Sequence, residues 1–430
     1  MPQLVLNKIM NDIADLFSSL PTSLACAILR DWLKLKSTIK LNSAFCNRSS
    51  RHIFLELLRS DEYSVLERVI VPRDIKRLEA KYLGLCKLGG KVRHVQIMTG
   101  FLAEEAAFVA NQFPNLTHVH FNGMTDIAPE LWTLIESPHI KCLRLTYWRC
   151  FDVASAHPAL EKNGHKICTL DFCMADISLS AFSQITRLCP NVESLSLAGT
   201  GVTDDVLKEI VVACPHIKHL DLQQNDVLTD EGMLSVVQSL SALESLNIAE
   251  LTSITGASLK HIYTHCAGQL HTLYFSCEEE MQQHFSSQVV NTLLQRCTKL
   301  HTLSFSDFDL ESTGILLEPA SLATLTTIIL SGAVINDNNL VTIGQHAVNV
   351  QTLAIASFRS CHANAILALC LGCPKLRVIH VDVERHNYDF ECSNIKALAE
   401  VAMLLWTRLR PGLKVHDFED GLYEYRVMDM

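Results

Sequence analysis

Two cysteines three positions apart, Cys370 and Cys373, form the clearest pattern in this chain that could carry chemistry. A Cys-x-x-Cys pair can supply half of a zinc site, or it can cycle between a dithiol and a disulfide. The sequence has no second Cys-x-x-Cys to complete a zinc site. Cys373 also lies three residues before a recurring apolar position, and Cys189, Cys214 and Cys297 occupy the equivalent place. We therefore expect these four thiols to fill core positions, since cysteine packs as a small apolar side chain.

A second pattern is His261-x-x-x-His265, which would put two imidazoles on the same side of a helix. Zinc can be bound at this spacing. The acid of the His-Glu-x-x-His enzyme signature is absent, because Ile262 follows the first histidine. The helix is also expected to lie on the solvent side of the fold. We interpret both histidines as solvated side chains and expect no metal site here.

Motifs of the common enzyme classes are missing from the sequence. It contains no phosphate-binding Gly-x-x-x-x-Gly-Lys-Ser/Thr loop, no Gly-x-Ser-x-Gly elbow and no dinucleotide-binding glycine fingerprint. Serine, histidine and aspartate are plentiful, but their spacing does not indicate a catalytic triad. We expect a protein that is not an enzyme and that needs no cofactor. A metal-dependent or thiol enzyme is a weaker alternative.

Charge and composition narrow the partners and the compartment. The formal net charge is −10, the pI is near 6.0, and the sequence has no run of Lys or Arg. We therefore expect neither nucleic acid nor an anionic membrane as a partner. The N-terminus does not resemble a signal peptide, and no stretch approaches about 18 uninterrupted apolar residues. The sixteen cysteines are scattered. These features favour a cytoplasmic or nuclear protein with reduced thiols.

The elements that must position these residues follow from an internal repeat. The pattern apolar-x-x-apolar-x-apolar recurs twelve times at intervals of 24 to 30 residues. Such a period is typical of a solenoid, in which neighbouring repeats share one core. The repeats, numbered 1 to 12, begin at Val92, Leu116, Ile140, Ile167, Val192, Ile217, Leu243, Leu270, Leu300, Leu325, Val350 and Leu376.

Each repeat predicts one short strand followed by one helix. The apolar-x-apolar alternation is that of a strand with one buried face. A helical stretch follows, and Thr203, Thr229 and Thr255 stand at the matching helix starts. A threonine hydroxyl can cap the first free amides of a helix, and the acids that follow Thr203 and Thr229 suit the helix dipole.

These residues resemble the cysteine-containing class of leucine-rich repeats. The match is carried by Leu188-Cys189-Pro190-Asn191-Val192-x-x-Leu195-x-Leu197 with Val202-Thr203-Asp204, and by Cys214-Pro215-His216-Ile217-x-x-Leu220-x-Leu222. The resemblance implies a right-handed α/β solenoid, a horseshoe of about twelve strand-helix units with strands on the concave side. It covers residues 88–410, and an insertion near Glu278-Glu279-Glu280 lengthens one repeat. Residues 61–87 are expected to be a helical linker or N-terminal cap, and residues 411–430 a C-terminal tail.

Residues 1–60 do not carry the repeat, and the spacing of their apolar residues predicts a small all-α segment. Leu20-Pro21, Ile28-Leu29, Leu41 and Phe45-Cys46 follow one another in this segment. Through these residues it resembles the F-box, a motif of about forty residues in three helices. Trp is usual soon after the motif's cysteine, but Asn47-Arg48-Ser49 stands there instead. The alternative is a helical cap on the first repeat. The resemblance implies contact with the adaptor of an SCF complex through Leu20, Pro21, Ile28, Leu29, Trp32, Leu33, Leu41 and Cys46.

The outward strand positions are the candidate target-binding surface. Histidine, arginine and aspartate gather in repeats 2 to 4, where neighbouring strands would align them in a row. Arginine beside histidines and an aromatic ring suits an acidic or phosphorylated peptide, although an aspartate in the row could simply pair with the arginine. Alternatively, a sheet face merely needs soluble residues. The candidates are His118, His120, Arg144, Trp148, Asp171 and Tyr274.

Together these resemblances imply the substrate-recognition subunit of an SCF-type E3 ubiquitin ligase. The N-terminal helices would bind the adaptor, which links to the cullin scaffold, and the horseshoe would hold a target protein for ubiquitin-dependent degradation. The chain would act through proximity alone. The alternative is a non-catalytic repeat scaffold or inhibitor whose N-terminal helices only cap the solenoid.

Overall fold

The structure is a computed structural model of the 430-residue chain. It describes residues 69–71, 92–98, 110–111, 113–124, 129–149, 153–276, 284–306, 317, 319–330, 335–355, 362–381 and 414–417. The eight residues expected to bind an adaptor, from Leu20 to Cys46, lie outside the described residues, as does the insertion near Glu278.

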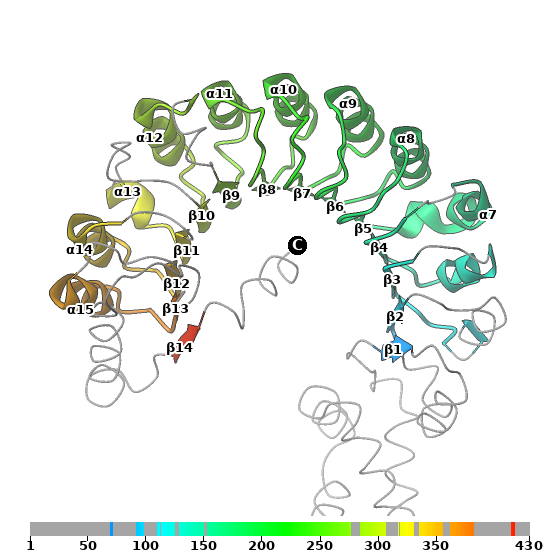
Figure 1. Ribbon diagram of the computed structural model, residues 1–430, viewed down its shortest axis with the longest axis horizontal. Coiled ribbons are helices and arrows are strands. Elements are labelled where there is room, and N and C mark those ends of the chain that lie inside the picture. Colours follow the sequence, from blue (N-terminus) through cyan, green and yellow to red (C-terminus); the bar gives the residue numbers. More distant parts are fainter. Residues whose placement is uncertain are drawn as a thin grey trace, which may run out of the picture. The chain divides into compact units, whose positions relative to one another are not determined.

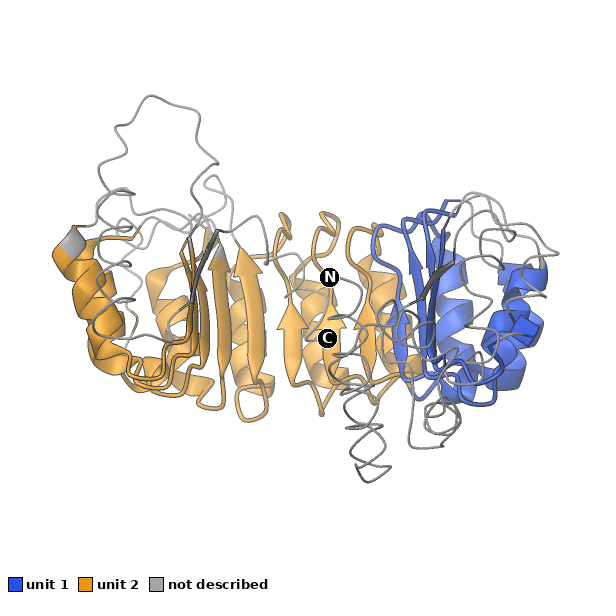
Figure 2. Ribbon diagram, turned by 90° about the horizontal axis from the view of Figure 1, so that it is seen from below, with its two compact units in different colours: residues 1–191 blue, residues 192–430 orange. Residues whose placement is uncertain are grey.

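The chain divides into two compact units, residues 1–191 and residues 192–430 (Figure 2). Unit 1 contains five parallel strands with helices on one side of them. Its strands are β1 (Val69–Val71), β2 (His94–Met98), β3 (His118–Asn122), β4 (Cys142–Thr146) and β5 (Thr169–Asp171). Its helices are η2 (Pro129–Glu136), α7 (Val153–Asn163), η3 (Gly164–Lys166) and α8 (Leu179–Leu188), of which η2 and η3 are 3-10 helices.

Unit 2 continues the alternation, with its strands in one layer and its helices in the other (Figure 1). Its strands are β6 (Ser194–Ser196), β7 (His219–Asp221), β8 (Ser245–Asn247), β9 (Thr272–Ser276), β10 (Thr302–Ser306), β11 (Thr327–Leu330), β12 (Thr352–Ile355), β13 (Val378–Val381) and β14 (Lys414–Asp417). Its helices are α9 (Asp204–Ala213), α10 (Asp230–Ser239), α11 (Gly256–His265), α12 (Ser287–Arg296), α13 (Pro319–Leu322), α14 (Asp337–His346) and α15 (Ala363–Gly372).

Strands β2 to β13 are the twelve repeat strands that the sequence predicts, and the expected α/β solenoid is confirmed. Within each unit, neighbouring strands run parallel and pair in register, as Leu220 does with Leu246 and Leu246 with Leu273. Parallel strands joined by helices are the arrangement that one strand and one helix per repeat require. We call the side of the strands away from the helices the strand face.

Two strands lie outside the expected bounds of the repeats, one at each end of the sheet. Val69–Val71 pairs with β2, inside the segment expected to be helical, and a run of β-branched residues favours a strand over a helix. Lys414–Asp417 pairs with β13, inside the expected tail. Each added strand covers backbone groups that would otherwise stay unpaired at the edge of the repeat sheet.

The core of each repeat combines inward strand residues with the apolar stripe of its helix. In repeat 5, Leu195 and Leu197 point inward from the strand, and both are almost fully buried. Leu207, Ile210 and Val211 of α9 are fully buried, at the spacing of one helix face. Each such side chain contributes about 1.5–3 kcal/mol relative to exposure. The core is therefore continuous along each unit and depends on neighbouring repeats.

A buried asparagine fixes the turn that leaves a strand. Asn225 is fully buried, and its Nδ2 donates to the carbonyl oxygens of Leu197 and Leu222 at 2.9 and 2.8 Å. Its Oδ1 accepts from the backbone N–H of Val202 at 3.2 Å. One side chain thus satisfies backbone groups of two successive repeats that no water can reach.

Aspartates at helix starts join each repeat to the next. The carboxylate of Asp204 accepts from the backbone N–H of Thr229 at 3.0 Å and from its hydroxyl at 2.6 Å. Asp230 binds Thr255 in the same way, at 2.9 and 2.6 Å, and it also accepts from the backbone N–H and the hydroxyl of Ser258. Each carboxylate therefore anchors the start of the following helix.

The predicted threonine caps are confirmed at two of three helices. Thr229 accepts from the backbone N–H of Glu231, and Thr255 accepts from that of Ala257, each at 3.2 Å. Thr203 precedes α9 but makes no side-chain cap hydrogen bond, so that prediction was wrong. At this helix the acids of the first turn, Asp204 and Asp205, remain to interact with the dipole.

The glycine between Cys370 and Cys373 has a packing role. A Cβ at Gly372 would lie 2.1 Å from the carbonyl oxygen of Gly344, because α14 and α15 approach closely there. Leu371, the other residue of the Cys-x-x-Cys pair, is exposed. The pattern is therefore explained by helix packing: both cysteines and the glycine face the neighbouring repeat, and the leucine faces outward.

Candidate functional site

The strand face of unit 1 carries the predicted polar row. His120 lies opposite Arg144 on the neighbouring strand, and Arg144 lies opposite Asp171 on the next. These side chains point away from the helices because each lies between two inward apolar residues of its strand. The predicted alignment of the row is confirmed, and its role in binding a target stays a proposal.

Arg144 and Asp171 form an ion pair within this row. Nε of Arg144 lies 3.7 Å from Oδ2 of Asp171, and the two side chains are 23% and 14% exposed. Burial raises the pKa of Asp171 above its ordinary value, although a hydrogen bond from the Cys173 amide and the charge of Arg144 both oppose the rise. At 3.7 Å the ion pair is a loose one. The other donors of the guanidinium can therefore bind a second acidic group.

His118 contributes little positive charge at neutral pH. Its ring packs on that of His94, with centroids 3.9 Å apart, and its Nδ1 lies 2.8 Å from the Thr117 hydroxyl. Burial lowers the pKa of His118 from 6.5 to about 4, and the nearby charges of His94, Arg144 and Lys141 add to the effect. His118 is therefore a neutral hydrogen-bonding group at pH 7 and not a cation.

His120 is more enclosed than the sequence suggests. It is 9% exposed, and its Nε2 lies 2.7 Å from the Thr146 hydroxyl. A ring held in this way orients Thr146 and the start of the turn after β4. Of the predicted row, Arg144 is therefore the residue best placed to meet a ligand directly.

Trp148 is not part of this surface, and its prediction as a target-binding residue was wrong. The side chain is fully buried. It stacks on Trp132 with ring centroids 5.8 Å apart and planes 7° apart, and it packs edge-on against Phe121. The reason is the turn after β4, where the chain leaves the strand and directs the indole into the core. Its neighbour Tyr147 is the exposed aromatic residue, at 57%.

Tyr147 and Met174 are residues that sequence reasoning did not assign to the site. Both have a left-handed backbone, with φ of 52° and 55°, where Gly123 and Gly199 occupy the corresponding positions of other repeats. The backbone N–H of Tyr147 donates to the carbonyl oxygen of Cys173 at 3.0 Å, which places these turns side by side. Met174 is 39% exposed. Two large exposed apolar side chains thus lie where glycine would be conformationally cheaper.

Tyr274, on the strand face of unit 2, is also less available than predicted. It is 8% exposed and belongs to an apolar cluster with Ile329 and Ala354. These residues are on β9, β11 and β12, and a large ring among close strands is covered by its neighbours. As a freely exposed contact residue, Tyr274 was therefore a wrong choice.

The predicted core thiols are confirmed as buried. Cys189, Cys214, Cys297 and Cys373 are free and at most 2% exposed. Burial raises the pKa of the Cys214 thiol to about 12. Its thiolate fraction, and hence its reactivity, is very small at neutral pH.

Possible ligands for metal ions do not gather in the part of the chain that is described. Among those residues, no three His, Cys, Asp or Glu side chains are grouped in a way that could hold an ion. His265 is exposed on α11, and His261 is half-buried there. No helix within the described ranges is long and apolar enough to cross a membrane.

Comparisons with known proteins agree with this architecture. A leucine-rich-repeat family model matches residues 213–237. The DNA repair protein rhp7 of Schizosaccharomyces pombe is 24% identical over 173 residues, which is 39% of this chain and 31% of that relative's length. The match therefore spans about a third of the fission yeast protein.

Two solved structures match this chain at low sequence identity. In the crystal structure of the Rad7 and Elc1 complex in yeast, the matching chain is 17% identical with a TM-score of 0.51, and the match covers 96% of this chain and 97% of that one. The leucine-rich-repeat protein LegL7 from Legionella pneumophila is 16% identical with a TM-score of 0.44, covering 64% and 93%. The family match, the twelve repeat strands and the first of these structures lead to one conclusion: the chain folds as an α/β solenoid of leucine-rich repeats.

Proposed function

We propose that this chain is the substrate-recognition subunit of an SCF-type E3 ubiquitin ligase, and that it catalyses nothing itself. Its repeats would hold a target protein, and residues 1–60 would bind the adaptor that connects it to the cullin scaffold. The observation that carries the proposal is the in-register strand face, which presents side chains of successive repeats at regular spacing to a protein ligand. The proposal places the protein in the cytoplasm, the nucleus or both.

The edge of the repeat sheet supports a separate role for residues 1–60. Strand β1 pairs with β2 through Val69, Ile70 and Val71 and already covers the backbone of the first repeat. Residues 1–60, which the sequence predicts to be helical, are therefore not needed to pair with that edge, which favours a binding role over a cap. The matching chain comes from the crystal structure of a complex of two proteins, Rad7 and Elc1. That the fission yeast relative is a DNA repair protein is compatible with a nuclear site of action.

Co-purification with the SCF adaptor tests this proposal. Replacing Leu20, Pro21 and Ile28 with Ala should abolish co-purification, because these apolar residues carry the F-box resemblance. A matched triple variant with Ala at Asn47 and Arg48, where the motif is not followed, and at Arg51 should still bind. Circular dichroism of both variants checks that the repeats remain folded. If the first variant binds the adaptor as well as the parent chain does, the plain scaffold is the better description.

The target surface is proposed to centre on Arg144 and Tyr147 of repeat 3. Arg144→Gln removes the charge without placing a second acid beside Asp171, which a change to Glu would do. It should weaken capture of a target from cells while adaptor binding stays unchanged. Arg187→Gln, an exposed arginine on α8, is the matched control. Equal target capture by the two variants would exclude this surface.

A further inference from the structure

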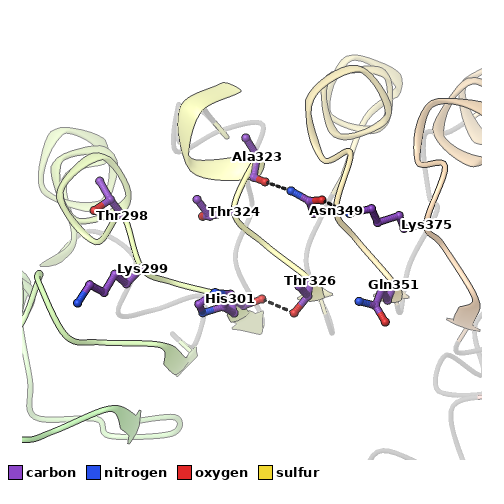
Figure 3. A pocket seen from close by; sticks show the side chains of 9 residues that line it. All are labelled: Thr298, Lys299, His301, Ala323, Thr324, Thr326, Asn349, Gln351 and Lys375. Carbon is purple, nitrogen blue, oxygen red and sulfur yellow. Dashed lines mark hydrogen bonds between the residues drawn. The ribbon is translucent and has the colours of Figure 1, made fainter.

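A polar groove lies at the edge of unit 2 where strands β10 to β13 begin (Figure 3). It has a volume of about 400 Å³ and is formed by the turns that lead from each helix to the next strand. Because every repeat has this turn, the same three positions of successive repeats lie side by side along the groove. The lining residues are Thr298, Lys299, His301, Ala323, Thr324, Thr326, Asn349, Gln351 and Lys375.

The groove is positively charged and contains no acidic residue. Lys299 and Lys375 are the lysines of the lining, and neither lies within ion-pair distance of a carboxylate among the residues that the structure describes. Lys375 donates to Oδ1 of Asn349 at 2.7 Å, and Nδ2 of Asn349 donates to the carbonyl oxygen of Ala323 at 2.7 Å. The amide therefore holds the ammonium in place without neutralising it.

Neighbouring repeats of unit 2 show that this excess charge is local. At the turn position held by His301 in the groove, Lys218 pairs with Glu193 at 2.9 Å. His271 lies 3.9 Å from Glu244 at the same position. From β10 onward this position is held by His301, Thr326, Gln351 and Arg377, and none is acidic. The alternation of opposite charges thus ends where the groove begins, in a chain whose formal net charge is −10.

The chemistry of the lining points to the anionic side chains of a peptide. Ammonium groups and the Gln351 amide can donate hydrogen bonds to a carboxylate or a phosphate group. The volume suits one or two side chains, and His301 is the one aromatic ring in the lining, so a series of stacked bases has no platform. A long polyanion would also meet the overall negative charge of the chain.

We propose that this groove binds an acidic or phosphorylated segment of a partner protein, with Lys299 and Lys375 as its principal anchors. The identification of that partner as the ubiquitination target rests on the proposed function. Binding of an acidic peptide does not, because it depends only on the groove.

Fluorescence anisotropy with a labelled hexaglutamate peptide and the full chain tests the groove. Lys299→Glu combined with Lys375→Glu should weaken binding by about tenfold or more, since two attractions become repulsions. Lys208→Glu combined with Lys260→Glu, at exposed lysines of α9 and α11, changes the net charge by the same amount and should change binding less than twofold. Raising the salt from 0.05 to 0.5 M should weaken binding by the parent chain, because screening acts on exposed charges. A labelled peptide with two phosphoserines distinguishes phosphate from carboxylate as the preferred group.

Three results would overturn the proposal. The first is hexaglutamate binding that is unchanged in the double variant. The second is an equal loss in the charge-matched control at Lys208 and Lys260. The third is tighter binding of a short duplex DNA of the same charge, lost in the same double variant, which would assign the groove to a nucleic-acid backbone. Adaptor co-purification should be unaffected by the double variant, so failure of the groove and failure of the proposed function can be told apart.

Discussion

The aspartate that joins repeats 6 and 7 allows a quantitative test of how the solenoid is held together. Asp230 accepts four hydrogen bonds from Thr255 and Ser258, and Ser258 is fully buried. Asp230→Ala removes an anchor at a helix start, which costs about 0.5–2 kcal/mol. It also leaves buried donors of Ser258 unsatisfied, which costs about 1–3 kcal/mol. We expect a loss centred on about 3 kcal/mol.

Hydrogen exchange measured by mass spectrometry resolves this loss along the chain. A loss of about 3 kcal/mol corresponds to roughly hundredfold faster exchange, because about 1.4 kcal/mol is a factor of ten. We expect it in α11, residues 256–265, while the preceding helix α9 is little changed. Glu231→Ala is the matched control, since Glu231 is an exposed acid in the first turn of α10, the helix that begins at Asp230. Equal exchange in α11 for the two variants would refute the reasoning.

Three further predictions concern packing, reactivity and pH. Gly372→Ala should lower the free energy of unfolding by about 1–3 kcal/mol in urea titration, because its Cβ would collide with α14, whereas exposed Leu371→Ala should change it little. Mass spectrometry after iodoacetamide treatment should show Cys168 alkylated in the native chain and Cys214 only in denaturant, as the Cys214 thiol is fully buried with a pKa raised to about 12. Burial lowers the pKa of His118 from 6.5 to about 4, so the neutral ring stabilises the fold fully above pH 6.5, and this stabilisation is lost as the pH falls through 4. His118→Gln should therefore flatten the pH dependence of the free energy of unfolding between pH 6.5 and 4.

The repeat strands could be predicted from the sequence because their signal is periodic. Each inward position must be apolar to enter the shared core, so Leu220 and its equivalents mark every strand. The same logic identified Cys214 as a core residue. Strand β14 escaped prediction because Asp417 stands where the pattern requires an apolar residue. Strand β1 was overlooked, although Leu66, Val69 and Val71 match the pattern 26 residues before Val92.

The candidate site was less predictable because it depends on backbone direction within short turns. Sequence reasoning selected Trp148 as the exposed ring, and the structure exposes Tyr147 instead. The deciding factor is the left-handed backbone of Tyr147, which glycine would have signalled and tyrosine does not. The groove at Lys299 and Lys375 escaped notice for another reason. Its residues are distant in sequence and meet only when successive turns are compared position by position.

Helix-start aspartates accept hydrogen bonds from the repeat that follows them in the chain. Asp204 serves the helix that begins after Thr229, Asp230 serves the one after Thr255, and Asp337 binds the backbone N–H of His362 at 2.7 Å. In each case the earlier repeat supplies the acceptor and the later repeat receives the support. During synthesis, the ribosome releases each acceptor before the helix that needs it. Each finished repeat can therefore act as the template for the next one, so the solenoid can grow in the order in which it is translated.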